Sequence, residues 1–113
     1  MHPRSPQLLE TVRDAGAFIR EVTQGVTLEQ YAADRLLRQA VERNFEIIGE
    51  AIKRLALADA ATVARISHHQ QIIAFRNVLI HGYDLLDHAL VLETAHHQVP
   101  ALLAQVEVLL RGG

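Results

Sequence analysis

Cysteine and tryptophan are absent from this sequence of 113 residues, and its aromatic residues are two tyrosines and three phenylalanines. Without cysteine the chain has no disulfide scaffold, and so few aromatic residues are not typical of a protein built from β-strands. Half of the residues are nevertheless apolar, which excludes disorder and supplies a core for one domain of common size. The many leucines and alanines favour close-packed helices.

Long hydrophobic runs are also missing. No apolar stretch approaches the roughly 20 residues that cross a bilayer, and the first six residues lack the hydrophobic segment that follows the charge of a signal peptide. We therefore expect a cytoplasmic protein without membrane contact. The net charge of -2 argues against a general nucleic-acid coat, which is normally basic. Any contact with RNA must come from a local patch.

Two helix-start signals divide the first half of the chain. Ser5 begins the first helix, with a proline in the opening turn where a missing N–H costs nothing, and Gly25 is its expected stop. Thr27 and Gln30 form a capping box for the second helix. No proline interrupts the sequence from there to about Leu57, which predicts a helix of about 30 residues and about 45 Å. A helix of that length implies an elongated bundle.

A short helical connector is expected at residues 58–64, and the next helix-start signal comes after it. Ser67 and Gln70 form a second capping box. The helix that it opens is expected to continue to Gly82, which we expect to end it as a left-handed cap residue.

The remaining part of the chain carries two more helix signals. Asp84 or Asp87 caps a fourth helix, which Pro100 breaks or restarts before a final apolar segment that ends near Leu110. No strand alternation, internal repeat or low-complexity tract is present. The sequence thus predicts one all-α domain over residues 1–113, an elongated up-and-down bundle of four to five helices.

The most informative segment ends the helix that precedes Gly82. It places Arg76, Asn77, His81 and Tyr83 within eight residues. Asn77 and His81 are four residues apart and share a helix face, whereas Arg76 and His81 are five apart and diverge by about 140°. Either Arg76 reaches round the helix on its long stem, or its partner at the site comes from another subunit.

These residue types suit the cleavage of RNA through its own 2′-hydroxyl. Arginine holds a phosphate through two parallel hydrogen bonds, histidine moves protons near neutral pH, and asparagine orients the imidazole. No metal is needed. The plain alternative is a surface Arg76 with a helix-terminal His81 that interacts favourably with the helix dipole, and a half-buried Tyr83 that only packs.

A resemblance extends this interpretation. The segment from Arg76 to Tyr83, R-N-V-L-I-H-G-Y, resembles the R-x4-H-x-Y signature of HepT-type toxins in the HEPN superfamily. The stretch from Glu42 to Leu55 contains I-G-E-A-I-K-R-L and is similar to the family's long second helix. Two motifs in the right order are far more specific than one. One departure is Ser67-His68-His69, which stands where many relatives carry Pro-Trp before the motif helix.

The resemblance implies an architecture and an activity. HEPN proteins are helical bundles that form homodimers, with the Arg and His motifs of the two copies facing each other across a cleft. They are ribonucleases that need neither metal nor cofactor. HepT members are toxins encoded beside a nucleotidyltransferase antitoxin (MNT), which transfers AMP from ATP to the motif tyrosine. By position, Arg76 and His81 are then the catalytic pair, Asn77 is the supporting residue and Tyr83 accepts AMP.

Two histidine pairs invite a metal interpretation. They are His68-His69 and His96-His97. Adjacent residues on a helix point about 100° apart, so neither pair is a natural chelate, and no H-E-x-x-H motif is present. We expect solvated surface at both pairs and no metal site.

The predicted long helix holds four further residues of interest. Asn44 lies on its apolar stripe, either as a buried polar residue satisfied by a neighbour or symmetry mate, or as part of the cleft. Arg43 and Lys53 supply charge to an RNA groove or, with glutamates interspersed, form ordinary helix ion pairs. Gly49 is expected to permit close helix–helix approach.

Two other function classes fit the same residues. The chain is alternatively a non-catalytic helical subunit that binds a nucleotide or docks a nucleotidyltransferase. The negative charge and the scarcity of aromatic residues favour that class, since binders of single-stranded RNA commonly use basic grooves and aromatic platforms. A purely structural oligomerisation domain is the third. Measuring RNA cleavage in the presence of EDTA distinguishes a ribonuclease from both of these classes.

Overall fold

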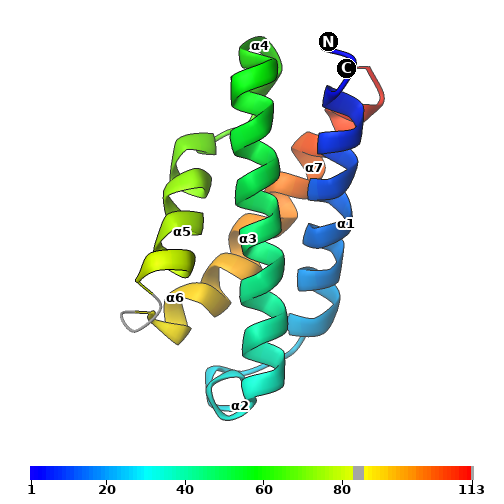
Figure 1. The fold of residues 1–113 in the computed structure, drawn as a ribbon. Helices are drawn as coiled ribbons and strands as arrows, with labels where there is room; N and C mark the ends of the chain where they lie inside the picture. Colours follow the sequence, from blue (N-terminus) through cyan, green and yellow to red (C-terminus); the bar gives the residue numbers. More distant parts are fainter. Residues whose placement is uncertain (83–85, 113) are drawn as a thin grey trace.

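The helices run alternately up and down the long axis of the molecule in the computed structural model, which describes residues 1–82 and 86–112 (Figure 1). The Cα atoms extend over 42 × 28 × 19 Å, and the described residues form more helical segments than the four to five predicted. All elements among the described residues are helical, as predicted. They are α1 (Ser5–Thr23), α2 (Leu28–Ala33), α3 (Arg35–Ala58), α4 (Ala60–Val63), α5 (His69–His81), α6 (His88–Glu93), a π-helical turn (Thr94–Gln98) and α7 (Val99–Leu110).

The central helix is α3, which packs against α1 on one side and α5 on the other, while α7 packs against α1 (Figure 1). Apolar side chains from these helices recur at helical spacing, so each helix buries one stripe in the shared core. Fully buried members of that core include Leu9, Val12, Ile19, Val41, Ile52, Leu55 and Val106. No helix among the described residues has the length and apolar content to cross a membrane.

The predicted helix from Thr27 to Leu57 is wrong as a single rod, because the chain breaks at Asp34. The capping box at Thr27 and Gln30 is present, with both of its hydrogen bonds formed. The short helix α2 ends at Ala33. The Asp34 side chain then accepts a hydrogen bond from the Leu37 N–H at 3.0 Å, and the Asp34 backbone lies outside the helical region. A short acidic side chain satisfies a helix start better than a helix interior, so α3 begins anew. Its 24 residues span about 36 Å.

The start of α5 differs from the prediction of a capping box at Ser67 and Gln70. Ser67 pairs instead with Gln105 of α7: the Ser67 N–H donates to Oε1 at 3.0 Å, and Nε2 donates to the Ser67 hydroxyl at 2.8 Å. His68 precedes the helix in the left-handed region at φ 62°. The amide of a distant helix therefore bonds Ser67, and no side chain caps α5.

The end of α5 also corrects an expectation. Gly82 has φ -125° and donates its N–H to the Val78 carbonyl, so it is not a left-handed cap. Tyr83 and Asp84, both named in the predictions, lie outside the described residues. Asp87 caps α6 as predicted, because one carboxylate oxygen accepts from the N–H groups of the second and third helix residues.

The helix restarts at Pro100, as predicted. The Val99 N–H donates to the Thr94 carbonyl five residues back, which forms the π-helical turn, and α7 begins at Val99 with proline in its first turn. Proline has no N–H and crowds the carbonyl four residues before it. The wider turn accommodates that ring, so the α-helix restarts at once along a continuous path.

Candidate functional site

The site is built on the crossing of α3 and α5. Gly49 of α3 is buried against Arg76 of α5, and a Cβ added to Gly49 would overlap the Arg76 Cβ and lie 3.0 Å from its Cγ and Cδ. Only glycine allows the two backbones to approach this closely. The expectation that Gly49 permits close helix–helix approach is thus confirmed, and the residue it admits is the motif arginine.

The Arg76 side chain, 20% exposed, is held by polar groups on both helices. Its Nη2 lies 2.8 Å from Glu50 Oε2, and its Nη1 donates to Asn77 Oδ1 at 3.3 Å. The Nε atom is buried without a hydrogen-bond partner in the described part of the chain. Glu50 also accepts from Arg54 Nε at 3.0 Å through its other oxygen. One carboxylate therefore orients two arginines.

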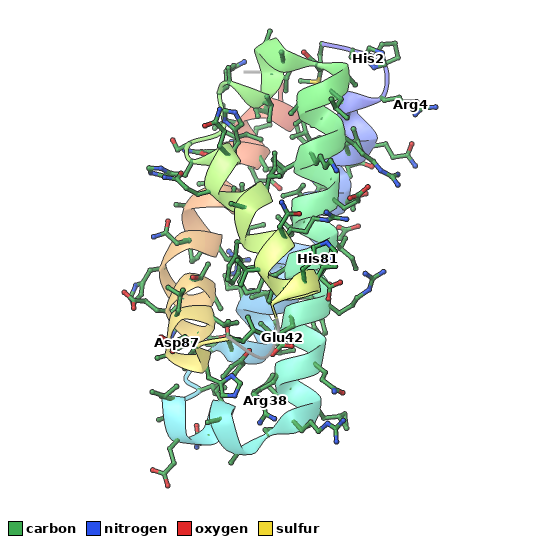
Figure 2. The ribbon with its side chains drawn as sticks, turned by 60° about the vertical axis from the view of Figure 1, so that its left-hand side comes forward. His2, Arg4, Arg38, Glu42, His81 and Asp87 are labelled. Carbon is green, nitrogen blue, oxygen red and sulfur yellow. The ribbon has the colours of Figure 1, made fainter. Side chains whose placement is uncertain are left out.

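The other motif residues lie toward the end of α5. Asn77 and His81 are exposed, and Figure 2 shows His81 near the middle of the molecule, on the same side as Glu42 of α3. The amide of Asn77 bonds to Arg76 rather than to His81. No hydrogen bond or ion pair joins Arg76 to His81 among the described residues. Within one chain, each of the two predicted catalytic groups is thus placed without a direct hydrogen bond to the other.

A groove of about 820 Å³ runs beside Arg76 between the start of α1, the length of α3 and the end of α5. Four arginines and two glutamates line it, over an apolar floor. The charged members are Arg4, Arg43, Glu46, Glu50, Arg54 and Arg76. The groove therefore carries a surplus of positive charge in a chain whose net charge is -2, and it is the kind of local patch that contact with RNA requires.

The residues singled out on α3 differ in which of their two interpretations they follow. Asn44 is half-buried and donates to the Ala40 carbonyl at 2.8 Å, so a neighbour in its own helix satisfies it. Arg43 pairs with Glu46 at 3.7 Å and also lines the groove. Lys53 is exposed and does not line it. Sequence analysis missed Arg54, although its spacing of four from Glu50 was a signal, and missed Arg4, for which no local signal exists.

The histidine pairs lie apart from this groove. His96 is half-buried and its Nε2 lies 2.8 Å from the Thr23 carbonyl, which corrects the expectation of a solvated residue: it ties the π-helical turn to the end of α1. His97 is exposed. His68 bonds to the side chain of Gln71. Among the described residues, no group of three or more potential ligand side chains is arranged to hold a metal.

A second polar cluster, not foreseen from the sequence, lies where α2, α3 and α6 meet. Tyr31 is fully buried and contacts the ring of His88 edge-on at 6.1 Å. Burial, and secondly the charge of Glu42, raises the pKa of Tyr31 well above its ordinary value. Burial likewise raises the pKa of Glu42, which the charges of His88 and Arg38 oppose. The cluster joins α2 to the body of the bundle beneath the motif helix.

Comparisons with known proteins point in one direction. Residues 12–109 match a family model described as ribonuclease HepT-like. A protein of Caldanaerobacter subterraneus subsp. tengcongensis that carries a provisional RNase name is 30% identical, with 91% of each chain covered. One from Thermococcus cleftensis, provisionally named ribonuclease HepT, is 30% identical over 89% of this chain and 91% of its own. A protein of Methanocaldococcus jannaschii, also provisionally named an RNase, is 26% identical, with 88% of this chain and 89% of that protein covered. No solved structure matches the chain.

Proposed function

Since the chain belongs to the ribonuclease HepT-like family of HEPN proteins, we propose that it is a toxin that cleaves RNA without a metal ion. The observation that carries the proposal is the position of Arg76. It is the arginine of the family motif, and it is anchored by Glu50 at the edge of a groove with surplus positive charge. A guanidinium held in this way is oriented before substrate arrives, which is how charge developing in a transition state is stabilised most effectively.

The motif residues divide the chemistry between them. His81 accepts the proton of the 2′-hydroxyl, whose oxygen attacks the adjacent phosphorus, while the 5′-oxygen leaves and takes a proton from an acid. Arg76 holds the non-bridging oxygens as their charge grows. Asn77 and Glu50 act on Arg76, which they contact. The acid that protonates the leaving 5′-oxygen is the His81 of another copy.

The proposal includes a homodimer, because no hydrogen bond joins Arg76 to His81 among the described residues of one chain. Arg76 faces α3 and the groove, whereas His81 is exposed at the end of α5. A second copy related by a two-fold axis brings one chain's imidazole to its mate's guanidinium, because a closed two-fold contact repeats each residue on both sides. The dimer therefore supplies two equivalent sites, or one composite site on the axis.

Control by a nucleotidyltransferase antitoxin is the last part of the proposal. Tyr83 lies two residues beyond His81 in the motif, at the position that the family implies as the AMP acceptor. Adenylylation there adds a phosphodiester anion and a purine close to the motif. Arg76 then pairs with the bound phosphate in place of an RNA phosphate, and the adenosine fills the cleft.

The test is RNA cleavage in EDTA by the parent and by His81→Ala, with His97→Ala as a matched control at an exposed histidine outside the groove. We expect His81→Ala to lose about 10²–10⁴-fold in rate, the usual contribution of positioned proton transfer, while His97→Ala keeps the parent rate. Equal cleavage by His81→Ala contradicts the mechanism. A parent that cleaves no RNA, alone or with its partner removed, favours the non-catalytic accessory subunit instead.

A further inference from the structure

The proposed chemistry uses one of the four arginines that line the groove, and leaves three without a role. Arg43 and Arg54 come from α3, and Arg4 comes from the start of α1. Figure 2 shows Arg4 at the upper end of the molecule and His81 near its middle, so the groove extends well beyond the motif. From Arg43 to Ala58 its lining covers four turns of α3, a length of about 22 Å.

The glutamates in the groove leave much of this arginine surface available. Arg54 is 67% exposed and contacts Glu50 through Nε, at 3.0 Å, and no acceptor for its terminal nitrogens is found among the described residues. Arg43 is 69% exposed, and its ion pair with Glu46 is long at 3.7 Å. Exposed pairs of this kind are weak. A phosphate, which accepts two parallel hydrogen bonds from a guanidinium, competes with them effectively.

The rest of the lining indicates what kind of contact the groove makes. Leu8, Ile47 and Ala51 are apolar and lie between the charged residues, and no aromatic side chain is among the lining residues. The apolar side chains suit contact with sugars, and the planar guanidinium cations suit contact with phosphates. Bases bind to proteins mainly by stacking on aromatic side chains, and the lining of this groove has none. The surface is therefore suited to a backbone rather than to a particular base sequence.

We propose that this groove binds the sugar–phosphate backbone of single-stranded RNA across the bond that is cut, with Arg54 and Arg4 contacting phosphates on one side of Arg76 and Arg43 contacting a phosphate on the other. The inference rests on the proposed function for the identity of the strand, but the groove itself is defined by geometry and charge. It predicts binding that tolerates many sequences, weakens with salt and strengthens as the strand becomes longer.

The experiment measures binding of a fluorescently labelled single-stranded RNA of mixed sequence in the His81→Ala background, so that cleavage does not interfere. Arg4→Ala and Arg43→Ala are compared with Arg20→Ala, which removes the same charge from an exposed position of α1 outside the groove. We expect each groove variant to raise Kd about three- to tenfold and to lower the slope of log K against log salt by about 0.7. Arg20→Ala keeps the parent Kd and slope.

A second measurement compares cleavage of a dinucleotide with that of a long RNA, without the His81 substitution. The loss caused by the groove variants should grow with RNA length, because a dinucleotide reaches Arg76 without filling the groove. Parent-like binding and cleavage by both groove variants overturns this inference while the proposed function stands. Length-dependent loss of binding in a chain that cleaves nothing overturns the proposed function alone. If the variants instead lose self-association or capture of an acidic protein partner, with RNA binding intact, the groove is a protein interface and the inference is wrong.

Discussion

Gly49 of α3 lies directly against the side-chain stem of Arg76 on α5, so closely that no larger residue fits there without moving one helix. This contact sets the distance between the two helices where the motif arginine crosses α3. The next residue, Glu50, then receives the guanidinium at 2.8 Å. One glycine and one carboxylate, adjacent in sequence, thus place and orient the group that the proposed reaction depends on.

Gly49→Ala should displace α5 and reduce both stability and activity. Alanine improves helix propensity by about 1 kcal/mol, but overpacking at a closed contact costs about 1–3 kcal/mol. We expect a net loss of up to about 2 kcal/mol in denaturant unfolding, and a larger proportional loss of RNA cleavage.

The matched control is Gly16→Ala. A Cβ there meets Leu103 Cδ2 at 2.9 Å, the end of a flexible side chain that can rotate away. That variant should keep activity, since Gly16 lies on α1 facing α7. Full activity in Gly49→Ala would show that the close approach does not position Arg76.

Glu50→Gln should lower the rate of cleavage at saturating RNA by about tenfold, the factor that corresponds to about 1.4 kcal/mol of lost transition-state stabilisation. The amide keeps the shape of the side chain but loses the charge that orients Arg76. Glu93→Gln, at an exposed position of α6, is the control and should behave as the parent. An unchanged rate for Glu50→Gln, with an unchanged melting temperature, would leave Glu50 without a positioning role.

Tyr83→Phe should retain cleavage of RNA and escape silencing by the nucleotidyltransferase. Intact-mass spectrometry after incubation with the partner and ATP should show a gain of AMP on the parent and none on the variant. The chain has one other tyrosine, Tyr31, which is fully buried and so cannot accept AMP in the folded protein. An AMP gain that persists in Tyr83→Phe would place the modification on another residue type.

Asp59→Asn should destabilise the protein at neutral pH, and the difference should fade in acid. The Asp59 carboxylate accepts from the Thr62 hydroxyl at 2.6 Å, the His2 N–H at 2.9 Å and the Ser5 hydroxyl at 2.7 Å. These hydrogen bonds hold the pKa of Asp59 well below its usual range. A lowered folded-state pKa contributes stability above the unfolded-state pKa, near 3.9, and that stability is lost as pH falls through the folded value.

The measurement is the melting temperature of parent and Asp59→Asn from pH 7 down to the lowest pH at which both fold. Asparagine can still cap α4 through its one oxygen, but its NH2 group replaces the oxygen that accepts from Thr62, His2 and Ser5, so the variant removes the charge and those hydrogen bonds together. Asp14→Asn, exposed on α1, should show no such convergence. A difference between parent and Asp59→Asn that stays constant with pH would contradict the assignment.

Local signals predicted the elements that depend on neighbours in sequence. The capping box at Thr27 and the cap at Asp87 both form, since each needs only backbone groups two or three residues away. Ser67 failed as a cap because Gln105, 38 positions distant, bonds to both of its polar groups. Asp34 interrupts a helix that its flanking residues favour. No periodicity argument anticipates that break, because aspartates also occur on exposed helix faces, so Asp34 alone does not identify a helix start.

The amino-acid order by itself determined that this chain is helical, which residues form the R-x4-H-x-Y motif, and that Arg76 and His81 diverge on one helix. These follow from composition and from the 100° turn per residue, which tertiary contacts do not alter. Only the folded structure decided that Gly49 lies under Arg76, that Glu50 joins Arg76 to Arg54, and that Arg4 completes a basic groove. Those relations link helices far apart in sequence, and packing of side chains, rather than any local preference, sets which residues meet.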